Sequence, residues 1–275
     1  MLGLKASQHC EGCPGARAEG EHHPTLELTT ECPHRCPHCY CRYALRRGVR
    51  IRPGLYGEMG GCLTVSQYGE PTVLGTRLVE ILRRVREAGA FDRIDLQTRG
   101  CRPDLAGELS DLCDLIMVSV DTLDPDTYER LHGGEAERAR AFLSGVEEGL
   151  IVRSLFLPGI NDDLPEELAG MDCDPEEVFV QPLIPFGDAV ERLGRLGLDP
   201  DRFDLVGELL DWVEGFRELG FRVTAPACWL DSLERALREL GEEVDPRWLR
   251  YAPEPGVPRP RRRFVPLDEF LARLE

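Results

Sequence analysis

The stretch ECPHRCPHCYCRY, residues 31–43, places four cysteines and two histidines within thirteen positions. Thiolates and imidazoles are the protein ligands that bind zinc and iron–sulfur clusters. Cys32, Cys36 and Cys39 follow a C-x3-C-x2-C spacing, so three thiolates of one compact loop can face a common point. The stretch therefore predicts a metal site in a loop that directly follows the predicted strand at 25–30.

The chain as a whole is acidic, with 275 residues and a formal net charge of −17. This charge does not suit a broad contact with nucleic acid or an anionic membrane, because both need basic surface. No apolar run reaches the roughly 20 residues that cross a bilayer, and the N-terminus lacks the apolar region of a signal peptide. We therefore expect a cytoplasmic protein whose eleven cysteines are metal ligands or reduced thiols rather than disulfides.

Short apolar runs alternate with amphipathic helical patterns along most of the chain. Residues 76–89 carry apolar side chains at helical spacing and end at Gly89. Asp124 and Pro125 are predicted to begin another helix, which the Gly133-Gly134 pair interrupts. The predicted strands are 25–30, 62–69, 93–98, 115–120, 150–157, 177–184 and 221–225, and further helices are predicted at 105–113, 201–220 and 231–240.

This alternation predicts an α/β fold with a parallel sheet and helices outside it. Right-handed crossovers curl such a sheet, so we expect a partial (β/α)6 TIM-like barrel with short N- and C-terminal extensions. The expected divisions are a cysteine-containing extension over 1–24, the barrel over 25–225 and a helical, Pro-rich extension over 226–275. Active sites of such folds lie at the carboxyl ends of the strands, which is where the cysteine loop begins.

The cysteine loop by itself permits two metal assignments. A 4Fe–4S cluster uses one thiolate for each iron, so three cysteines would leave one iron open to a small molecule. Structural zinc is tetrahedral and prefers four ligands, and His34, His38 or Cys41 could supply the fourth. From these residues alone, a cluster is about as well supported as zinc or plain reduced thiols.

Further motifs give the loop a context. They are YGEP at 68–71, LQTRG at 96–100, VSVDTLDPDTYERLHGG at 118–134, LPGIND at 157–162 and VQPLIPFG at 180–187. Together with CPHRCPHCY at 32–40, they resemble the motifs of radical S-adenosylmethionine (SAM) enzymes, in the same order. The cysteine spacing is the specific part of this resemblance. The chain departs from the usual pattern at His38, Tyr68 and Arg99, where an aromatic residue, a glycine and an asparagine are common.

The resemblance implies that Cys32, Cys36 and Cys39 hold a 4Fe–4S cluster whose open iron binds SAM. The residues implied to contact SAM are Gly69 and Glu70 at its amino group, Ser119 and Asp121 at the ribose hydroxyls, Thr98 on the same rim, and His38 at the adenine. Structural roles are the alternative for each: Glu70-Pro71 could cap a helix, Ser119 could satisfy a strand end, and Asp121 could belong to a turn.

The implied reaction is reductive cleavage of SAM to a 5′-deoxyadenosyl radical, which then modifies a peptide, a protein or a small metabolite. The implied partners are SAM, that substrate and an electron donor of the ferredoxin or flavodoxin type. Two alternatives remain open: an activase that makes a glycyl radical in another enzyme, and a non-catalytic iron–sulfur or zinc protein.

The remaining cysteines allow a second site. Cys10, Cys13, Cys41 and Cys62 could hold another iron–sulfur cluster or zinc, with free thiols as the alternative. His9 is of interest because it precedes Cys10. The pair His22-His23 is predicted to lie in a solvated loop, and Cys113 is predicted to lie in the core.

Overall fold

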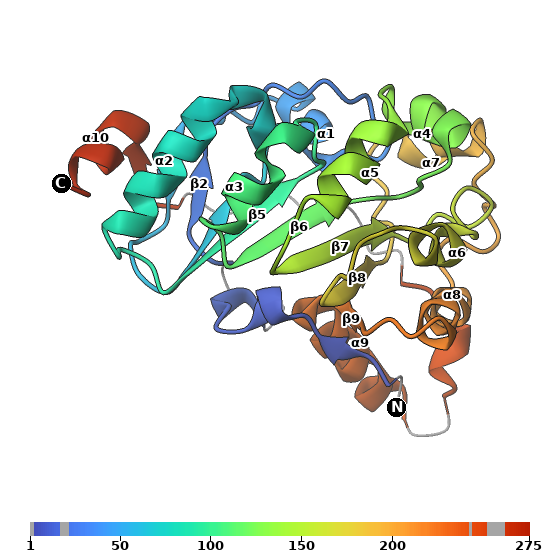
Figure 1. Ribbon diagram of the computed structural model, residues 1–275. Coiled ribbons are helices and arrows are strands. Elements are labelled where there is room, and N and C mark those ends of the chain that lie inside the picture. Colours follow the sequence, from blue (N-terminus) through green and yellow to red (C-terminus); the bar gives the residue numbers. More distant parts are fainter. Residues whose placement is uncertain (1–2, 17–21, 242–243, 252–261) are drawn as a thin grey trace.

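The computed structural model describes residues 3–16, 22–241, 244–251 and 262–275 (Figure 1). Its centre is a ten-stranded, mostly parallel sheet with the order β1-β9-β8-β7-β6-β5-β4-β2-β3-β10. The parallel barrel strands are β2 (Thr25–Glu27), β4 (Cys62–Val65), β5 (Arg93–Thr98), β6 (Leu115–Ser119), β7 (Leu150–Leu155), β8 (Glu177–Gln181) and β9 (Val223–Ala225). Since β1 and β10 form the two edges and do not pair, the sheet is an unclosed, partial barrel, as predicted.

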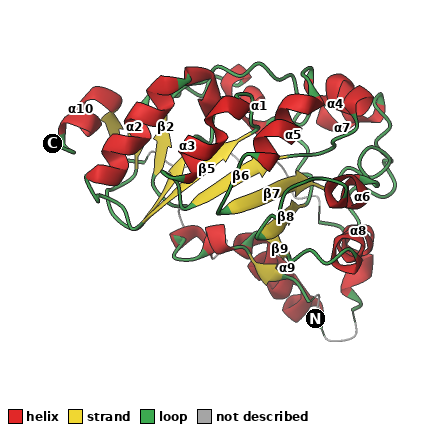
Figure 2. Cartoon of the chain, in the orientation of Figure 1, coloured by secondary structure: helices red, strands yellow, loops and turns green. Residues whose placement is uncertain are grey.

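Helices follow most of the strands and cover the outer face of the sheet (Figure 2). They are α1 (Tyr40–Arg46), α2 (Thr76–Glu87), α3 (Ala106–Ser110), α4 (Pro125–His132), α5 (Ala136–Ser144), α6 (Leu164–Ala169), α7 (Ala189–Gly194), α8 (Val206–Glu218), α9 (Ala227–Leu240) and α10 (Leu267–Ala272). Short 3-10 helices are η1 (Gln8–Cys10), η2 (Pro14–Ala16), η3 (Pro71–Leu74), η4 (Pro103–Leu105) and η5 (Pro246–Trp248).

Capping residues mark the ends of several helices. Asp124 accepts a hydrogen bond from the Thr127 amide at 2.8 Å and so caps α4, and Gly133 ends that helix in the left-handed conformation. Gly89, two residues after α2, has φ +57°. The apolar stripe of α2 is fully buried and consists of Leu78, Val79, Ile81, Leu82 and Val85. These confirmed predictions rest on local sequence patterns.

Three strands were not predicted. β3 (Gly54–Tyr56) pairs antiparallel with β2, and β10 (Phe264–Pro266) pairs antiparallel with β3. β1 (Lys5–Ala6) lies parallel to β9 at the other edge. Each has only two or three residues, too few for an alternating pattern to be visible in the sequence.

Residues 5–13, here called the floor segment, cross the amino ends of the barrel strands. Ser7 hydrogen-bonds the Glu177 carboxylate at the start of β8, and both side chains are buried. Further along, Arg93 at the start of β5 donates to the Gln8 carbonyl at 3.0 Å, and Cys62 at the start of β4 donates to the Glu11 carbonyl at 3.7 Å. The floor segment therefore covers the end of the barrel opposite the cysteine loop.

Within the described ranges, no helix combines the length and apolarity needed to cross a membrane.

Candidate active site

The cysteine loop leaves the carboxyl end of β2 and leads into α1. Cys39 is the N-cap of this helix, and its sulfur accepts a hydrogen bond from the Arg42 amide at 3.4 Å. A hydrogen bond from Cys41 is the main cause that lowers the pKa of Cys39, and the same contact raises the pKa of Cys41. The Arg42 amide thus orients the Cys39 sulfur at the start of α1.

Cys41 differs from its neighbour although it lies only two residues away. Its thiol donates to the Gln67 carbonyl at 2.9 Å. Burial further raises the pKa of Cys41. The bond to Gln67 holds the Cys41 sulfur against the backbone beyond the carboxyl end of β4.

Cys36 is buried and hydrogen-bonds His132 of α4, with 3.2 Å between its sulfur and Nδ1. Arg99 lies 3.0 Å from the other ring nitrogen, Nε2. Arginine can only donate, so Nε2 accepts, and the proton on Nδ1 points at the Cys36 sulfur. Burial and the Arg99 cation hold the pKa of His132 well below its usual value, which keeps this ring neutral.

Behind this contact lies a buried ion pair. Arg99 donates to Asp121 at 3.1 Å, and His38 approaches the same carboxylate at 3.4 Å. Although burial opposes ionisation, Arg99 and His38 hold the pKa of Asp121 well below its usual value. Asp121 also accepts from the Leu155 amide at 3.2 Å. These contacts fix Arg99 and His38 beneath the cysteine loop.

The loop suits a group larger than a single ion. In the described part of the chain, one ligand atom each from His9, His23 and Asp95 lies within 4.8 Å of the other two. The three cysteines of the loop form no such group among the described residues. Zinc–sulfur bonds of ~2.3 Å would require sulfurs roughly 3.8 Å apart. Two buried loop atoms, Nδ1 of His34 and Nδ1 of His38, have no hydrogen-bond partner. The spacing of the thiols fits a bound 4Fe–4S cluster better than a single zinc ion.

Gly69 and Glu70 lie against the cysteine loop. Gly69 has φ +72°, and a Cβ there would lie 2.4 Å from the Thr29 carbonyl, so only glycine permits this packing. The buried Glu70 accepts four protein hydrogen bonds: at Oε1 from the Thr72 amide, the Thr72 hydroxyl and the Thr98 hydroxyl, and at Oε2 from the Arg99 amide at 2.7 Å. It caps η3 and ties the ends of β4 and β5 together.

Ser119 ends β6 and accepts a hydrogen bond from Arg153 of β7 at 2.7 Å. The other partner of Arg153 is the Gln97 carbonyl oxygen, at 2.9 Å. Both partners are neutral. Burial and the nearby Arg99 lower the pKa of Arg153, but arginine remains a cation at neutral pH. Among the described residues, Arg153 is thus a cation at the carboxyl ends of the strands that has no directly bonded carboxylate.

Three residues of this edge were not predicted to have roles: His132, Arg153 and Gln97. Arg153 was visible as a lone charge within the apolar predicted strand at 150–157. His132 lies in a predicted motif, but nothing local indicates that its ring would face Cys36 some 96 positions away in the sequence.

The structure does not bring together the four cysteines predicted for a second site. Cys62 lies at the amino end of β4, near Cys10 and Cys13, whereas Cys41 bonds Gln67 beyond the carboxyl end of the same strand. The prediction for His22-His23 is wrong for one member, since His23 is buried. Cys113 is buried in the core, as predicted.

A pocket of about 220 Å³ lies beside the cysteine loop. It is lined by His34, Arg99, Cys101, Tyr128 and Arg138, among others. Typical small-molecule sites have volumes of about 300–1,000 Å³. The pocket is therefore too small to hold SAM by itself.

Comparison with known proteins identifies relatives of this chain. No family model matches it. An uncharacterised protein of Methanocaldococcus jannaschii is 31% identical over 245 residues, which are 84% of this chain and 83% of that protein. A GTP 3',8-cyclase of Rhodopseudomonas palustris is 38% identical over 104 residues, a match that covers 34% of this chain and 30% of the cyclase.

The fold agrees with a solved structure, spore photoproduct lyase with bound AdoMet and a dinucleoside spore photoproduct. The TM-score is 0.50 at 14% identity, over 82% of this chain and 79% of that one. This likeness shows a shared fold, and the methanogen protein shows a shared family over most of both chains. Together with the ordered motifs, these findings place the chain in the radical SAM enzyme superfamily, in one family with the methanogen protein.

Proposed function

We propose that this enzyme reductively cleaves SAM at a 4Fe–4S cluster held by Cys32, Cys36 and Cys39. The observation that carries this proposal is the arrangement of three thiols on one loop at the carboxyl edge, too widely spaced for a single ion. When bound, such a cluster supplies the electron that breaks a carbon–sulfur bond of SAM, and the resulting 5′-deoxyadenosyl radical removes hydrogen from a substrate. Cys41, the remaining cysteine of the loop region, donates to the Gln67 carbonyl instead.

Arg153 is suited to the carboxylate of SAM. Its guanidinium is held by Gln97 and Ser119, which fix its direction without cancelling its charge. A carboxylate that binds beside it would gain a charge-assisted hydrogen bond in surroundings of low dielectric. In this proposal, Ser119 acts mainly by positioning Arg153, in addition to any contact with a ribose hydroxyl.

Glu70 is suited to the amino group of SAM. Three of its four protein hydrogen bonds fall on Oε1, so Oε2 keeps acceptor capacity for one more donor. Thr98 orients this carboxylate, and Gly69 brings it against the cysteine loop. Asp121 and His38 remain proposed contacts of the ribose and the adenine. Their mutual ion pair fixes the ring of His38 through Nε2 and leaves Nδ1 without a partner.

We expect the substrate to be a peptide, a protein or a small metabolite, and the electron to come from a ferredoxin or flavodoxin. Oxygen should inactivate the enzyme, so an anaerobic cytoplasm is the expected setting. The activase alternative concerns the substrate only and would use the same site. No contact described above favours it, and membership of an enzyme superfamily does not favour the non-catalytic alternative.

The proposal is tested by anaerobic reconstitution of wild-type protein and of two matched variants, Cys36→Ala and Cys41→Ala. Wild type and Cys41→Ala should bind about four irons and release 5′-deoxyadenosine when SAM and dithionite are added, even without substrate. Cys36→Ala should lose both the iron and the product. If Cys36→Ala forms product at the wild-type rate, or if wild-type protein loaded with iron forms none, the proposed function is wrong.

A further inference from the structure

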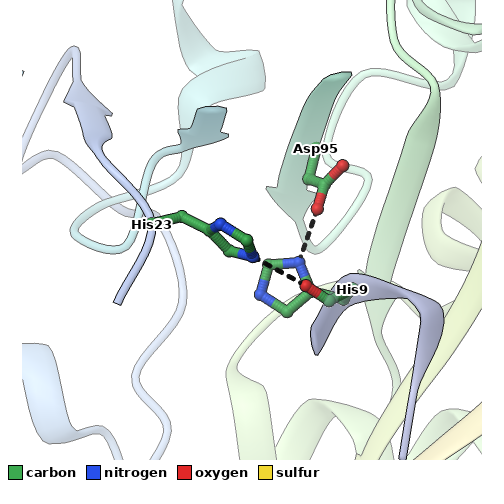
Figure 3. A group of neighbouring side chains, drawn as sticks. All are labelled: His9, His23 and Asp95. Carbon is green, nitrogen blue, oxygen red and sulfur yellow. Dashed lines mark hydrogen bonds and ion pairs between the residues drawn. The ribbon is translucent and has the colours of Figure 1, made fainter. Parts of the chain in front are cut away.

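The floor of the barrel carries a second group of metal-ligand residues, at the end opposite the cysteine loop. His9 comes from η1, His23 lies just before β2, and Asp95 lies within β5 (Figure 3). One ring nitrogen of each histidine and one oxygen of Asp95 lie within 4.8 Å of one another. His23 is 2% exposed and Asp95 is 0% exposed. We infer that these residues and Cys13 bind one zinc-class divalent ion, which fastens the floor segment to the barrel.

Hydrogen bonds join the atoms that the proposed ion would bind. His9 Nδ1 lies 2.7 Å from Asp95 Oδ2, and His23 Nε2 lies 2.9 Å from the carbonyl oxygen of His9. Metal–ligand bonds of ~2.0–2.2 Å in a tetrahedron place ligand atoms roughly 3.4 Å apart. An ion that replaces the proton between His9 and Asp95 therefore requires these two side chains to separate by only about 0.7 Å.

Arg93 holds the Asp95 carboxylate in place. Its Nε donates to Oδ1 at 2.8 Å and its NH2 donates to Oδ2 at 2.9 Å, while NH1 donates to the Gln8 carbonyl. Carboxylates that bind metals are themselves commonly hydrogen-bonded, and such outer partners orient the ligand. The guanidinium adds a positive charge near the ion, but a carboxylate and a thiolate in the ligand set would offset it.

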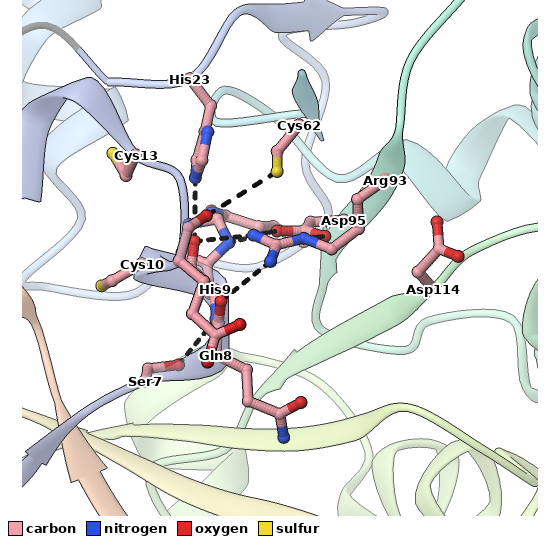
Figure 4. Close-up of polar contacts among 12 residues, drawn as sticks. Ser7, Gln8, His9, Cys10, Cys13, His23, Cys62, Arg93, Asp95 and Asp114 are labelled. Carbon is pink, nitrogen blue, oxygen red and sulfur yellow. Dashed lines mark hydrogen bonds and ion pairs between the residues drawn. The ribbon is translucent and has the colours of Figure 1, made fainter. Parts of the chain in front are cut away.

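Cys13 is the best candidate for the fourth ligand of the proposed ion. Its sulfur hydrogen-bonds His22, the sequence neighbour of the proposed ligand His23, with 3.7 Å between the sulfur and Nδ1. The two other nearby thiols have different partners: Cys10 accepts from the Ala227 amide, and Cys62 donates to the Glu11 carbonyl (Figure 4). Cys13 is therefore the floor thiol that lies beside the histidine pair 22–23.

The chemistry of this ligand set selects the ion. Two imidazoles, one carboxylate and one thiolate suit zinc, which takes mixed nitrogen, oxygen and sulfur ligands in a tetrahedron. A single thiol is too few for an iron–sulfur cluster. Four protein ligands, of which His23 and Asp95 are buried, would leave no open position, which is typical of a structural site. The ion would join three segments that are distant in the sequence and would hold the floor segment closed.

The test uses the 275-residue chain with Cys32→Ala, Cys36→Ala and Cys39→Ala, so that zinc cannot bind at the cysteine loop. Equilibrium dialysis against zinc, followed by metal analysis, should give about one zinc per chain. Adding His9→Gln or His23→Gln should weaken zinc binding by roughly 100-fold or more, since each removes a direct ligand. The matched control is Cys62→Ser, which changes a floor thiol bonded to the Glu11 carbonyl and should leave the affinity unchanged. With cobalt in place of zinc, a thiolate-to-cobalt charge-transfer band should appear and should be absent from Cys13→Ser.

The inference is wrong if the triple variant binds no zinc, or if His9→Gln and His23→Gln bind it as tightly as Cys62→Ser. In that case the cluster is a hydrogen-bond network alone. His23 is buried, so His23→Gln could fail to fold; His9, whose side chain is 13% exposed, then decides. Iron loading of His9→Gln in an otherwise unchanged chain reports separately on the cysteine loop and should remain at about four irons. Failure at the floor is thereby distinguished from failure of the proposed function.

Discussion

The two ends of the barrel each hold a partly buried arginine, and the two arginines have different partners. At the carboxyl edge, Arg153 bonds the neutral Gln97 and Ser119. At the floor, Arg93 makes two hydrogen bonds to the Asp95 carboxylate. An arginine whose charge is already paired is part of the scaffold, whereas one with neutral partners can bind an anionic ligand. Under the proposed function, this comparison assigns SAM binding to the carboxyl end and a structural role to the floor.

The distances between candidate ligand atoms also differ between the two ends of the barrel. The thiols of Cys32, Cys36 and Cys39 are spread over a loop, while the floor atoms of His9, His23 and Asp95 converge within 4.8 Å. A cluster of several irons needs separated ligands, and a single ion needs converging ones. The spacing of the ligand atoms, more than their chemical type, thus indicates the size of the bound group.

Replacing each arginine with methionine should give the largest difference between the two ends of the barrel. Arg153→Met should weaken SAM binding by roughly 100-fold, because it removes the charge partner of the SAM carboxylate. It should change the stability little, since no carboxylate is left unpaired. The measurements are equilibrium binding of SAM to the reconstituted protein and the thermal unfolding midpoint.

Arg93→Met is the matched variant at the floor. It leaves the buried Asp95 without its cation and should lower the free energy of unfolding by about 3–5 kcal/mol. SAM affinity of the folded fraction should stay at the wild-type value. If Arg93→Met reduced SAM affinity as much as Arg153→Met, the proposed division between the two ends would not hold.

Buried carboxylates allow a second comparison. Asp95 has a directly bonded arginine, whereas Glu27 at the end of β2 accepts from the backbone amides of Gln67 and Tyr68, at 3.2 and 3.0 Å, and Arg262 acts on it as a nearby cation. Burial raises the pKa of Glu27 from 4.5 to about 7. Between these values the unfolded chain loses the proton while the folded chain keeps it, so stability falls as the pH rises from about 4.5 to about 7. The total loss is about 3 kcal/mol.

Glu27→Gln removes this titration, because an amide has the same shape and no charge. The thermal midpoint of wild type should fall by roughly 5–10 °C between pH 5 and pH 8 relative to that of the variant. The variant loses one amide contact at every pH, so only the difference between the two pH profiles is informative. Parallel profiles would mean that Glu27 is ionised in the folded state at pH 5.

The sequence predicted those parts of the molecule that have local patterns. The barrel strands, α2 and the cap at Asp124 are each encoded within a few neighbouring residues, and so is the cysteine loop. His23 was assigned to solvent because its neighbours are polar. It is buried because the chain brings it to His9 and Asp95, and no local pattern encodes that meeting. The edge strands β1, β3 and β10 were missed because their pairing residues are distant in the sequence.

His132 provides the most sensitive prediction about the carboxyl edge. Its Nδ1 proton points at the Cys36 sulfur at 3.2 Å. A hydrogen bond to a cluster sulfur stabilises the reduced, more negative state. Such a bond contributes about 0.5–1.5 kcal/mol, which corresponds to roughly 20–60 mV for one electron. His132→Phe should therefore make the midpoint potential more negative by that amount, as measured by an anaerobic redox titration followed by electron paramagnetic resonance.

His34 offers the matched control. It is a histidine of the same loop region, but its Nε2 faces the sulfur of Cys101 at 3.1 Å, and Cys101 is not a proposed ligand. His34→Phe should leave the potential unchanged. His132→Asn, whose side-chain amide can replace the Nδ1 donor, should restore part of the shift. Equal shifts in His34→Phe and His132→Phe would indicate a general change in polarity around the loop, and the directed bond from His132 to Cys36 would then have no separate effect on the cluster.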